Sequence, residues 1–308
     1  MDAQEIRIGK SASHRFLRNI FPILLALPAL LPLIVLIALP AIRTIYMSLN
    51  RITYGLPDEW VGLNNYREIF RDPLFWSAFW NTIIFSFSVV TGEVGTGLLA
   101  AVIMSSRFKF QKLFISLIMV PYAVSEVVAV IIWKYMLEPN VGIINYVLHA
   151  WLHLPQIQWA SNPVEAWIVI ILLRVWINFP FSFLIIYSSL IGIPQELYES
   201  VYIEGASNWK GFRYVTLPLC TPAIMVATIF GFVFAFRNFA TVWIMTRGGP
   251  MHKTELLSTL LYKQAFSFWE FGLASAIAII MTVFTFVIAI YYLRGMYKQM
   301  FIKNATLG

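Results

Sequence analysis

The sequence predicts an all-α membrane protein, and three observations lead to this fold class. First, 59% of the 308 residues are hydrophobic and only 12% are charged, whereas soluble domains carry about 25% charged residues. Second, the apolar residues gather in six runs, each long enough to cross a bilayer as a helix of roughly 20 residues. Third, lysine and arginine are concentrated on one side of these runs, which is typical of a membrane protein with a defined orientation.

The six runs lie near residues 20–48, 80–104, 113–136, 164–188, 219–245 and 272–294. We expect each run to be helical, because lipid offers no partner for an unpaired backbone amide or carbonyl. The first run is longer than a signal-peptide core and lacks a small-residue cleavage pattern, so we expect it to remain as a helix. No linker or repeat divides the chain. One transmembrane domain is therefore expected at 20–295, between tails at 1–19 and 296–308.

The distribution of basic residues predicts that both termini are cytoplasmic. With the N-terminus inside, the cytoplasmic segments hold twelve of the 22 lysines and arginines, and the outer loops hold six. Such an excess marks the cytoplasmic side of a membrane protein. The net charge of +7 is spread between apolar runs, so it does not form the basic face of a nucleic-acid-binding domain.

Catalytic and metal-binding motifs are missing from the sequence. The single Cys220 excludes an internal disulfide, and no zinc-type cysteine spacing occurs. His149 and His153 have a metal-ligand spacing but no third ligand nearby. The stretch Gly9-Lys10-Ser11 lacks the earlier glycine and the strand of a phosphate-binding loop. We therefore expect no catalytic residue, no metal and no cofactor on this chain, so that any ATP must be hydrolysed by a partner.

The predicted cytoplasmic loop at 194–218 is the most informative segment. Pro194 suits a helix first turn, Gly205 a helix stop and Ser207 the cap of a second short helix. A helix pair lying on lipid headgroups is the alternative, but such helices are usually rich in lysine and arginine. The first helix has no basic residue, and anionic lipid would repel its carboxylates. A protein partner therefore fits better than lipid, given the three glutamates of this segment: Glu196, Glu199 and Glu204.

The spacing within this loop resembles a known motif. Glu199-Ser200-Val201, three residues, Gly205, nine residues and Val215-Thr216-Leu217-Pro218 are similar to the EAA loop of binding-protein-dependent ABC importer permeases, written EAA-x3-G-x9-I-x-LP. The departures are small or apolar replacements at Ser200, Val201 and Val215. Glu204-Gly205-Ala206 is similar to the D-G-A of the carbohydrate branch.

Three outer segments extend the resemblance over most of the chain. These segments are Val61 to Tyr66, Gly142 to Asn145 and Thr246 to Pro250. They are similar to segments of the larger permease subunit in the carbohydrate family that includes the maltose and glycerol-3-phosphate transporters. The resemblance implies the type I ABC importer architecture and a bacterial inner membrane. It also implies three kinds of partner: a second permease forming a heterodimer, two ATPases that bind ATP and Mg, and an extracytoplasmic solute-binding protein.

In that family the loop is the coupling helix, which docks on the ATPase and moves the membrane helices. The resemblance assigns polar contact with the ATPase to Glu199, the turn to Gly205 and the connection to the fifth span to Leu217 and Pro218. The ATPase-coupling residues expected on this basis are Glu199, Ser200, Val201, Glu204, Gly205, Ala206, Leu217 and Pro218.

Charged residues inside the runs are costly and mark functional or structural pairs. Glu93, Glu126 and Arg174 fall near the middle of spans, and Arg237 is expected to be buried in the outer part of the fifth. Whether a glutamate pairs with Arg174 or with Arg237 is left open. Polar donors beside aromatic rings suit a sugar. The predicted substrate pathway consists of Glu126, Arg174, Asn178, Phe181, Arg237, Asn238 and Thr241.

Two further expectations concern helix geometry. Pro180 is expected either to free backbone carbonyls toward a cavity or only to kink the fourth span. Glycines 92, 95 and 97 are expected to permit close packing of the second span.

The predicted function is the import of a carbohydrate, glycoside or sugar derivative by a permease subunit of an ATP-driven importer. The two arginines leave open an anionic solute, such as a sugar phosphate, a sulfonated sugar or a uronic acid. A membrane-embedded enzyme using Glu126 or Glu93 lacks a second catalytic group. An autonomous carrier would not need the cytoplasmic helix pair, and no inverted repeat is visible.

Overall fold

The structure is a computed structural model that describes residues 25, 28, 31–106, 108–153, 155–203 and 205–305, with side chains up to residue 296. The predicted N-terminal tail and Glu204 lie outside the described residues. The elements in chain order are η1 (Ile34–Ala38), α2 (Leu39–Ser48), β1 (Asn50–Arg51), β2 (Glu59–Trp60), α3 (Asn64–Arg71), α4 (Pro73–Ser105), α5 (Gln111–Ala123), α6 (Glu126–Met136), α7 (Ile143–Leu152), α8 (Pro163–Leu190), α9 (Glu196–Ile203), α10 (Asn208–Gly211), η2 (Phe212–Thr216), α11 (Leu217–Phe236), α12 (Ala240–Met245), α13 (Leu257–Phe266) and α14 (Phe271–Ala305).

The described residues contain five helices long and apolar enough to cross a membrane, or six if the bent pair α5–α6 is one span. The straight spans are Leu31–Ser48, Pro73–Ser105, Pro163–Leu190, Asn208–Phe236 and Phe271–Met296. The all-helical, six-span prediction is therefore confirmed. Two details of it were wrong, because the third span is bent by 95° and the fifth ends at Phe236 instead of residue 245.

The long helices lie side by side as a bundle, in which α4 and α8 form the most extensive pair of the described helices. Glycine makes this contact possible. A Cβ at Gly97 would lie 2.8 Å from the backbone nitrogen of Phe183, and one at Gly92 would lie 2.6 Å from Cγ2 of Val175. The packing role is therefore confirmed for Gly92 and Gly97. Gly95 takes no part in this contact, since an added Cβ would have no atom of the described chain within 4 Å.

The ends of two spans show why helices begin where they do. Asp72 accepts a hydrogen bond from the backbone nitrogen of Leu74 at the start of α4, and Asn162 accepts one from that of Val164 at the start of α8. In both helices a proline follows the cap, where its missing N–H costs nothing. Further along, α8 continues through Pro180 as one helix.

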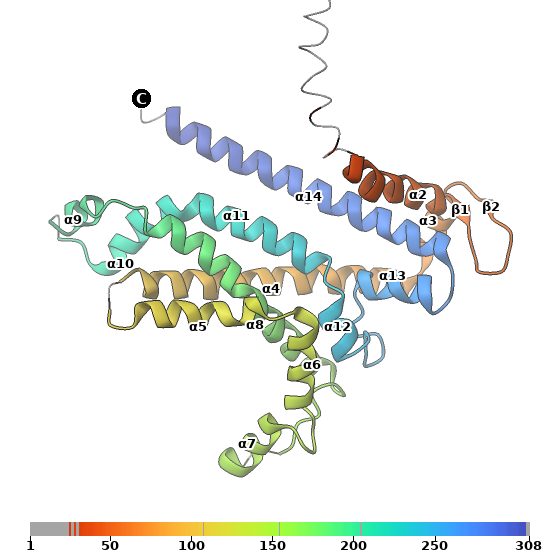
Figure 1. The fold of residues 1–308 in the computed structure, drawn as a ribbon, viewed down its shortest axis with the longest axis horizontal. Coiled ribbons are helices and arrows are strands. Elements are labelled where there is room, and N and C mark those ends of the chain that lie inside the picture. Colours follow the sequence, from red (N-terminus) through yellow and green to blue (C-terminus); the bar gives the residue numbers. More distant parts are fainter. Residues whose placement is uncertain are drawn as a thin grey trace, which may run out of the picture.

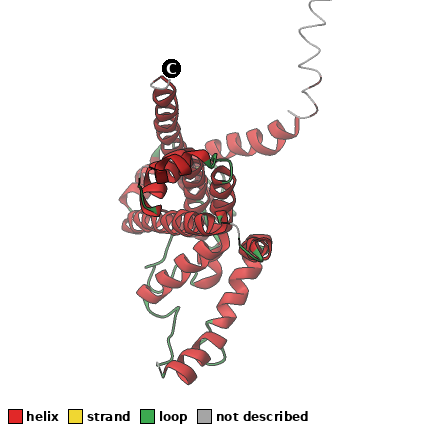
Figure 2. Cartoon of the chain, turned by 90° about the vertical axis from the view of Figure 1, so that its left-hand side faces the viewer, coloured by secondary structure: helices red, strands yellow, loops and turns green. Residues whose placement is uncertain are grey.

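The two ends of the bundle carry different elements (Figure 1). The α4–α5 connection, α9 and α10 lie at one end, and β1, β2, α3 and α13 lie at the other. The helices α6 and α7 form an arm that points away from the bundle in both views (Figures 1 and 2). We call the first end the α9 end and the second the hairpin end, after the antiparallel pair β1–β2.

Candidate translocation site and coupling helix

The break between α5 and α6 brings a carboxylate to the bundle. Pro121 lies inside the last turn of α5, where proline removes a helical hydrogen bond. Val124 and Ser125 then have extended ψ angles of 139° and 132°. The chain turns there, and Glu126 becomes the first residue of α6. This break is the physical reason why the apolar run at 113–136 is not one straight span.

The break between α11 and α12 lies opposite the first one. Arg237, Asn238 and Phe239 separate the two helices. The hydroxyl of Ser258, near the start of α13, donates to the carbonyl of Asn238 at 2.5 Å. This bond satisfies a backbone group that the break removes from the helical pattern. It also holds Asn238 so that its side chain faces Glu126.

Glu126 on α6 is the centre of a polar network that joins α8, α12 and the break between α11 and α12. Its Oε2 lies 3.0 Å from Nη1 of Arg174 on α8. Its Oε1 accepts hydrogen bonds from Nδ2 of Asn238 at 2.6 Å and from Oγ1 of Thr241 on α12 at 2.8 Å. Arg174 is only 5% exposed, so its charge is neutralised inside the protein. The pairing left open by the sequence is thus between Glu126 and Arg174.

Glu93 on α4 lies beside this network. Its side chain is 1% exposed. Asn178 and Arg174 of α8 line the same cavity as Glu93. Oε1 of Glu93 has no hydrogen-bond partner among the described residues. A Cβ at Gly231 on α11 would lie 3.0 Å from Glu93 Oε2, so a glycine there gives the carboxylate room.

A cavity of about 260 Å³ opens beside these groups. Aromatic rings form part of its wall, since Phe181 lies 6.2 Å from Tyr122 and 6.1 Å from Phe234 between ring centroids. The cavity combines charged, amide and aromatic side chains, which is a typical surface for a polyhydroxylated solute. Its lining residues are Glu93, Tyr122, Val124, Glu126, Arg174, Ile177, Asn178, Phe181, Gly231 and Phe234.

The structure divides the seven predicted pathway residues into three groups. Four of them line this cavity, namely Glu126, Arg174, Asn178 and Phe181. Asn238 and Thr241 are buried behind it and hold Glu126. Arg237 lines a different cavity and is exposed, so the expectation that it is buried with the others was wrong. The reason is that α11 ends at Phe236, so Arg237 and Asn238 no longer follow one helical surface.

Six residues of this cavity were missing from the predicted pathway, and two of them, Glu93 and Tyr122, bring polar side chains to it. Glu93 was noticed as a charge inside a span, which was the available signal, but its neighbours on α8 and α11 come from distant parts of the chain. Tyr122 lies just before the break in α5. Pro121 beside it signals a break in the helix, but it does not indicate that the chain turns toward Phe181.

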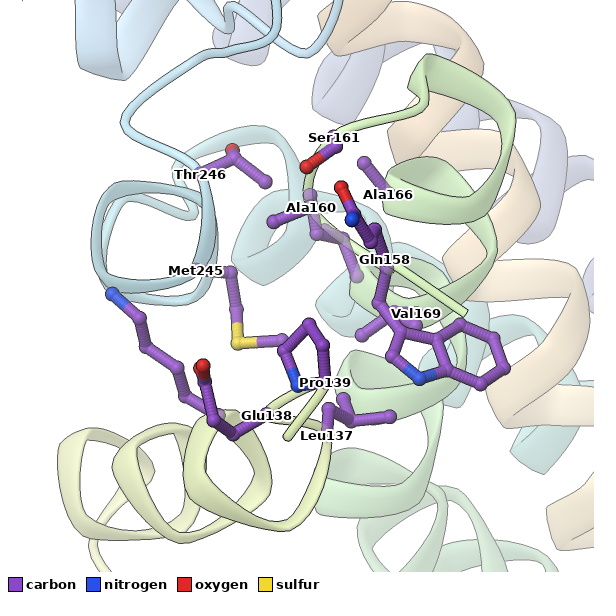
Figure 3. Close-up of a pocket in the computed structure, with 13 residues that line it drawn as sticks. Leu137, Glu138, Pro139, Gln158, Ala160, Ser161, Ala166, Val169, Met245 and Thr246 are labelled. Atoms are coloured by element: carbon purple, nitrogen blue, oxygen red, sulfur yellow. The ribbon is translucent and has the colours of Figure 1, made fainter. Parts of the chain in front are cut away.

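A second pocket of about 270 Å³ lies next to the network, where the end of α6 meets α8 and α12 (Figure 3). Lys134, Glu138, Gln158, Ser161 and Thr246 are among the polar residues of its wall. Nζ of Lys134 donates to the carbonyl of Ile244 at 2.9 Å. This bond fastens α6 to α12, and both of these helices carry residues of the Glu126 network. The described residues contain no cluster of three or more potential metal ligands.

At the α9 end, a single short helix projects from the bundle. None of the residues of α9 is buried, and Ile203 is 86% exposed. Gly205 follows with φ of +79°, a left-handed conformation that suits glycine. The phenolic oxygen of Tyr198 lies 2.9 Å from Oγ1 of Thr216, which ties α9 to the start of the fifth span.

The second predicted short helix is not a separate element. α10 runs directly through η2 into α11, and together they form the span Asn208–Phe236 of 29 residues. Ser207 stands at the predicted cap position, but no hydrogen bond from a backbone amide to its side chain is present. The predicted coupling residues Leu217 and Pro218 therefore lie inside this continuous helix.

Three buried polar residues fasten the loops around the hairpin end and the α6–α7 arm. Asn65 donates to the carbonyls of Ser48 and Asn50, both at 2.9 Å. Asn145 donates to the carbonyl of Ile157 at 3.0 Å, and the nitrogen of Ile157 donates back at 3.1 Å.

The third is Glu255, which is fully buried and contacts His252 and Lys263. It packs under Gly248, whose φ is +84°. Each of the three outer segments singled out in the sequence therefore takes part in a loop anchor.

Comparison with known proteins agrees with this architecture. The chain is 33% identical over 272 residues to the trehalose/maltose transport system permease protein MalF of Thermococcus litoralis, covering 88% of this chain and 92% of that protein. It is 32% identical over 278 residues to the sulfoquinovosyl glycerol transport system permease protein SmoG of Agrobacterium fabrum, covering 90% of each. The fold resembles that of a bacterial ABC transporter chain involved in importing the acidic polysaccharide alginate. That likeness has a TM-score of 0.82 at 19% identity, over 93% of this chain and 99% of that one.

The family model for the inner membrane component of binding-protein-dependent transport systems matches residues 93–294. This match includes both helix breaks, the Glu126 network and the whole of the α9 loop. The chain therefore belongs to the family of binding-protein-dependent transport system inner membrane components, and it is a permease subunit and not an enzyme.

Proposed function

We propose that this chain is a permease subunit of an ATP-driven importer for a carbohydrate or glycoside. The family supplies the class of transporter. The names of the relatives with trehalose/maltose and sulfoquinovosyl glycerol support a sugar or sugar derivative as solute. Its partners are a second permease, two ATPases that bind ATP and Mg, and a solute-binding protein on the outer side. In this arrangement the α9 end is cytoplasmic, as are the tails at 1–19 and 296–308.

One observation carries the mechanism: the coupling loop and the polar site lie at opposite ends of one helix. The span Asn208–Phe236 has a length of about 43 Å at 1.5 Å per residue. Gly205 and the Tyr198–Thr216 contact join α9 to its cytoplasmic start. At its other end, Asn238 binds Glu126. A push on α9 is therefore transmitted as a rigid-body movement to the site, as in other switching proteins.

The exposed carboxylate of Glu199 and the surface of α9 around it are the contact with the ATPase. Ser200, Val201 and Ala206 set how closely α9 approaches its partner, because they are small or apolar. Gly205 makes the turn, and Leu217 with Pro218 belongs to the helix that transmits the movement. Glu204 is assigned to the same contact from its place in the motif.

The solute site is the cavity beside Glu126, and its charges favour a neutral polyhydroxylated solute. Arg174 is already paired with Glu126 at 3.0 Å, and Glu93 adds a second carboxylate. Carboxylates accept hydrogen bonds from sugar hydroxyls, and an amide side chain can both accept and donate them. Phe181 and Tyr122 offer aromatic surface for a sugar ring. At about 260 Å³, the cavity lies just below the usual range of roughly 300–1,000 Å³. The second permease completes it.

An anionic sugar derivative is the second candidate. Transport of sulfoquinovosyl glycerol by one relative, as its name states, supports it. For this solute Glu126 would have to release Arg174 so that the guanidinium binds the anion. Such an exchange would replace one ion pair by another.

The experiment is uptake by the complete transporter in vesicles, with neutral and anionic sugars tested on the solute-binding protein. Asn178→Ala and Phe181→Ala are expected to raise KM for the solute, while ATP hydrolysis in its absence is unchanged. Arg174→Gln should abolish uptake of an anionic solute but only weaken uptake of a neutral one. Uptake by this chain alone, without ATPase, would overturn the proposal in favour of an autonomous carrier.

A further inference from the structure

A groove of about 410 Å³ lies at the α9 end, between the second half of α4 and the start of the fifth span. α4 contributes Gly95, Leu98, Leu99 and Val102 to its wall, and the fifth span contributes Asn208, Trp209 and Phe212. Most of this wall is apolar. The groove is separate from the Glu126 cavity, with which it shares no lining residue.

The apolar wall is left uncovered by the rest of the described chain. An added Cβ at Gly95 would have no atom within 4 Å, so this glycine leaves a slot in the surface of α4. Leu99 is 62% exposed and Trp209 is 67% exposed. The indole of Trp209 stacks with the ring of Phe212 at 5.5 Å between centroids. The slot is therefore open to an apolar occupant, with two aromatic rings on its other side.

The size of the groove favours a lipid chain over a helix. Gly95 and Val102 are seven residues apart, which is about 10 Å at 1.5 Å per residue. A helix with a diameter of about 10 Å would occupy about 800 Å³ over that length, which is twice the volume of the groove. An acyl chain is much thinner than a helix and can follow the slot at Gly95.

The groove also lies at the depth of one lipid leaflet. α4 ends at Ser105, so Val102 is about 5 Å and Gly95 about 15 Å from that end at 1.5 Å per residue. The hydrocarbon of one leaflet is about 15 Å thick, which is half of the bilayer core. Trp209 stands at the start of the span Asn208–Phe236, and tryptophan is enriched where a span meets the headgroups.

Two cations lie beside the groove on the same helix. Arg213 comes one turn after Trp209 and next to Phe212, and Lys210 adjoins Trp209. Both cations are exposed, and neither takes part in an ion pair within the part of the chain that the structure describes. The segment from Asn208 to Thr216 has no carboxylate. Anionic headgroups of the cytoplasmic leaflet attract such cations, and a guanidinium can bind a phosphate with two parallel hydrogen bonds.

We propose that an anionic phospholipid of the cytoplasmic leaflet binds in this groove. One acyl chain lies in the slot at Gly95, against Trp209, and the phosphate lies on Arg213 and Lys210. The chain covers the apolar wall, and the phosphate supplies the counter-charge that the two cations lack.

The bound lipid would regulate coupling, because the groove adjoins the coupling helix. The phenolic oxygen of Tyr202 on α9 would lie 3.3 Å from a Cβ at Gly211, so α9 packs directly against α10. A chain held against Trp209 limits the movement of the helix on which α9 rests. ATP hydrolysis is then coupled to uptake more tightly when the lipid is bound. This effect rests on the orientation and the coupling role proposed above, whereas lipid binding rests on the groove and its charges.

Photo-crosslinking tests the occupant. The complete transporter is placed in phosphatidylcholine nanodiscs with a small fraction of phosphatidylglycerol that carries a diazirine on its acyl chain. We expect cross-links to peptides that contain Leu99 or Trp209, and Gly95→Leu should reduce them severalfold because its side chain fills the slot. Thr96→Leu is the matched control, since Thr96 is exposed but outside the wall. Unchanged cross-linking in Gly95→Leu would overturn the proposal. Absence of these cross-links in the unmodified transporter would also overturn it, because another subunit would then cover the groove.

A second pair of variants tests the headgroup and leaves the slot intact. Arg213→Gln should reduce cross-linking of the phosphatidylglycerol probe severalfold and have little effect on a phosphatidylcholine probe with the same chain. Lys112→Gln removes the same charge from an exposed position on α5 outside the wall, so it should retain the cross-links. Equal cross-linking of the two probes in the unmodified transporter would overturn the assignment to an anionic lipid.

Coupling is measured as ATP hydrolysed per solute taken up by vesicles. In the unmodified transporter this ratio should be severalfold lower with phosphatidylglycerol present than with phosphatidylcholine alone, and Gly95→Leu should remove the difference. An equal ratio in both kinds of vesicle would overturn the regulatory effect. Failure of the proposed solute site would instead appear in the Asn178 and Phe181 variants, with lipid cross-linking intact.

Discussion

The hairpin end and the α9 end of the molecule are built in opposite ways. At the hairpin end, Asn65 and Glu255 are buried and bound to groups of the same chain. At the α9 end, no residue of α9 is buried, and its side chains Tyr198 and Tyr202 reach the fifth span at Thr216 and Gly211. The hairpin end is therefore held by contacts within this chain, whereas α9 is exposed and is the surface that we propose contacts the ATPase.

Because of this difference, we expect substitutions at the two ends to affect different properties, namely folding stability at one end and coupling to the ATPase at the other. Substitutions at the hairpin end remove internal hydrogen bonds or charges, so they should lower the free energy of unfolding. Substitutions in α9 remove few internal contacts, so they should leave unfolding nearly unchanged and act on contact with the ATPase. Four experiments test this difference, in order of decreasing effect.

The strongest test uses two glycines with the same backbone conformation. Gly205 has φ of +79° and Gly55, in the β1–β2 turn, has φ of +81°, and neither has an atom within 4 Å of an added Cβ. A β-branched residue in this conformation costs about 1–3 kcal/mol at either position. Gly205→Val should nevertheless uncouple ATP hydrolysis from uptake and reduce uptake by more than about tenfold. Gly55→Val should retain uptake. Equal loss in both variants, measured in vesicles with the complete transporter, would remove the distinction between the ends.

The next pair compares two glutamates. Glu255 is fully buried and contacts Lys263, so Glu255→Gln should lower the free energy of unfolding by about 3 kcal/mol. The control Glu199→Gln removes an exposed charge on α9 and should leave the melting temperature unchanged while weakening ATPase binding. Thermal unfolding in detergent and co-purification with the ATPase measure the two effects. The comparison fails if Glu199→Gln is the more destabilising of the two.

A smaller effect is expected when hydrogen bonds without a charge are removed. Asn65→Ala leaves the carbonyls of Ser48 and Asn50 without their donor, at a cost of about 2 kcal/mol. Ser200→Ala removes a bond from the hydroxyl to Leu197 within α9, where water replaces it. Hydrogen exchange should therefore become faster in β1 of the first variant and stay unchanged in the α9 amides of the second.

The smallest effect concerns pH. Burial raises the pKa of Glu270, the repulsion from Glu68 adds to this, and Arg51 opposes it. The folded state thus holds the proton more tightly than the unfolded state. Stability from this group is present below the ordinary carboxyl pKa and is lost as pH rises through the raised value. The protection factor of the Tyr54 amide, which is bonded to the carbonyl of Trp269, should be lower at neutral than at acidic pH once the base-catalysed intrinsic exchange rate has been divided out. Glu270→Gln should remove that dependence; an unchanged profile in the variant would assign it to another group.

Local patterns in the sequence predicted much of this fold. The fourth apolar run, expected at 164–188, is the helix Pro163–Leu190, and the second is the helix Pro73–Ser105. Gly205 was expected to end the first loop helix, and it has the left-handed conformation that such an ending uses. These features depend on residues next to one another, so hydropathy and turn chemistry are sufficient to find them.

The breaks at 124–125 and 237–239 could not be predicted in the same way. Both lie in apolar stretches, and hydropathy records only that a segment is apolar, without its direction. Pro121 precedes the first break, but Pro180 lies in α8 without one. Whether a proline ends a helix depends on which neighbours replace the lost hydrogen bond, and those neighbours are distant in the sequence.

The sequence by itself determined the membrane class, the helix count and the motif of the cytoplasmic loop, because each follows from composition or from short spacing. Only the tertiary structure decided what the two arginines do. Arg174 meets Glu126, and Asn238 meets the same carboxylate across 112 residues, while Arg237, beside Asn238 in the chain, faces an open cleft. The physical reason is that ion pairing depends on distance in space, and a single break in a helix is enough to send adjacent side chains to different surroundings.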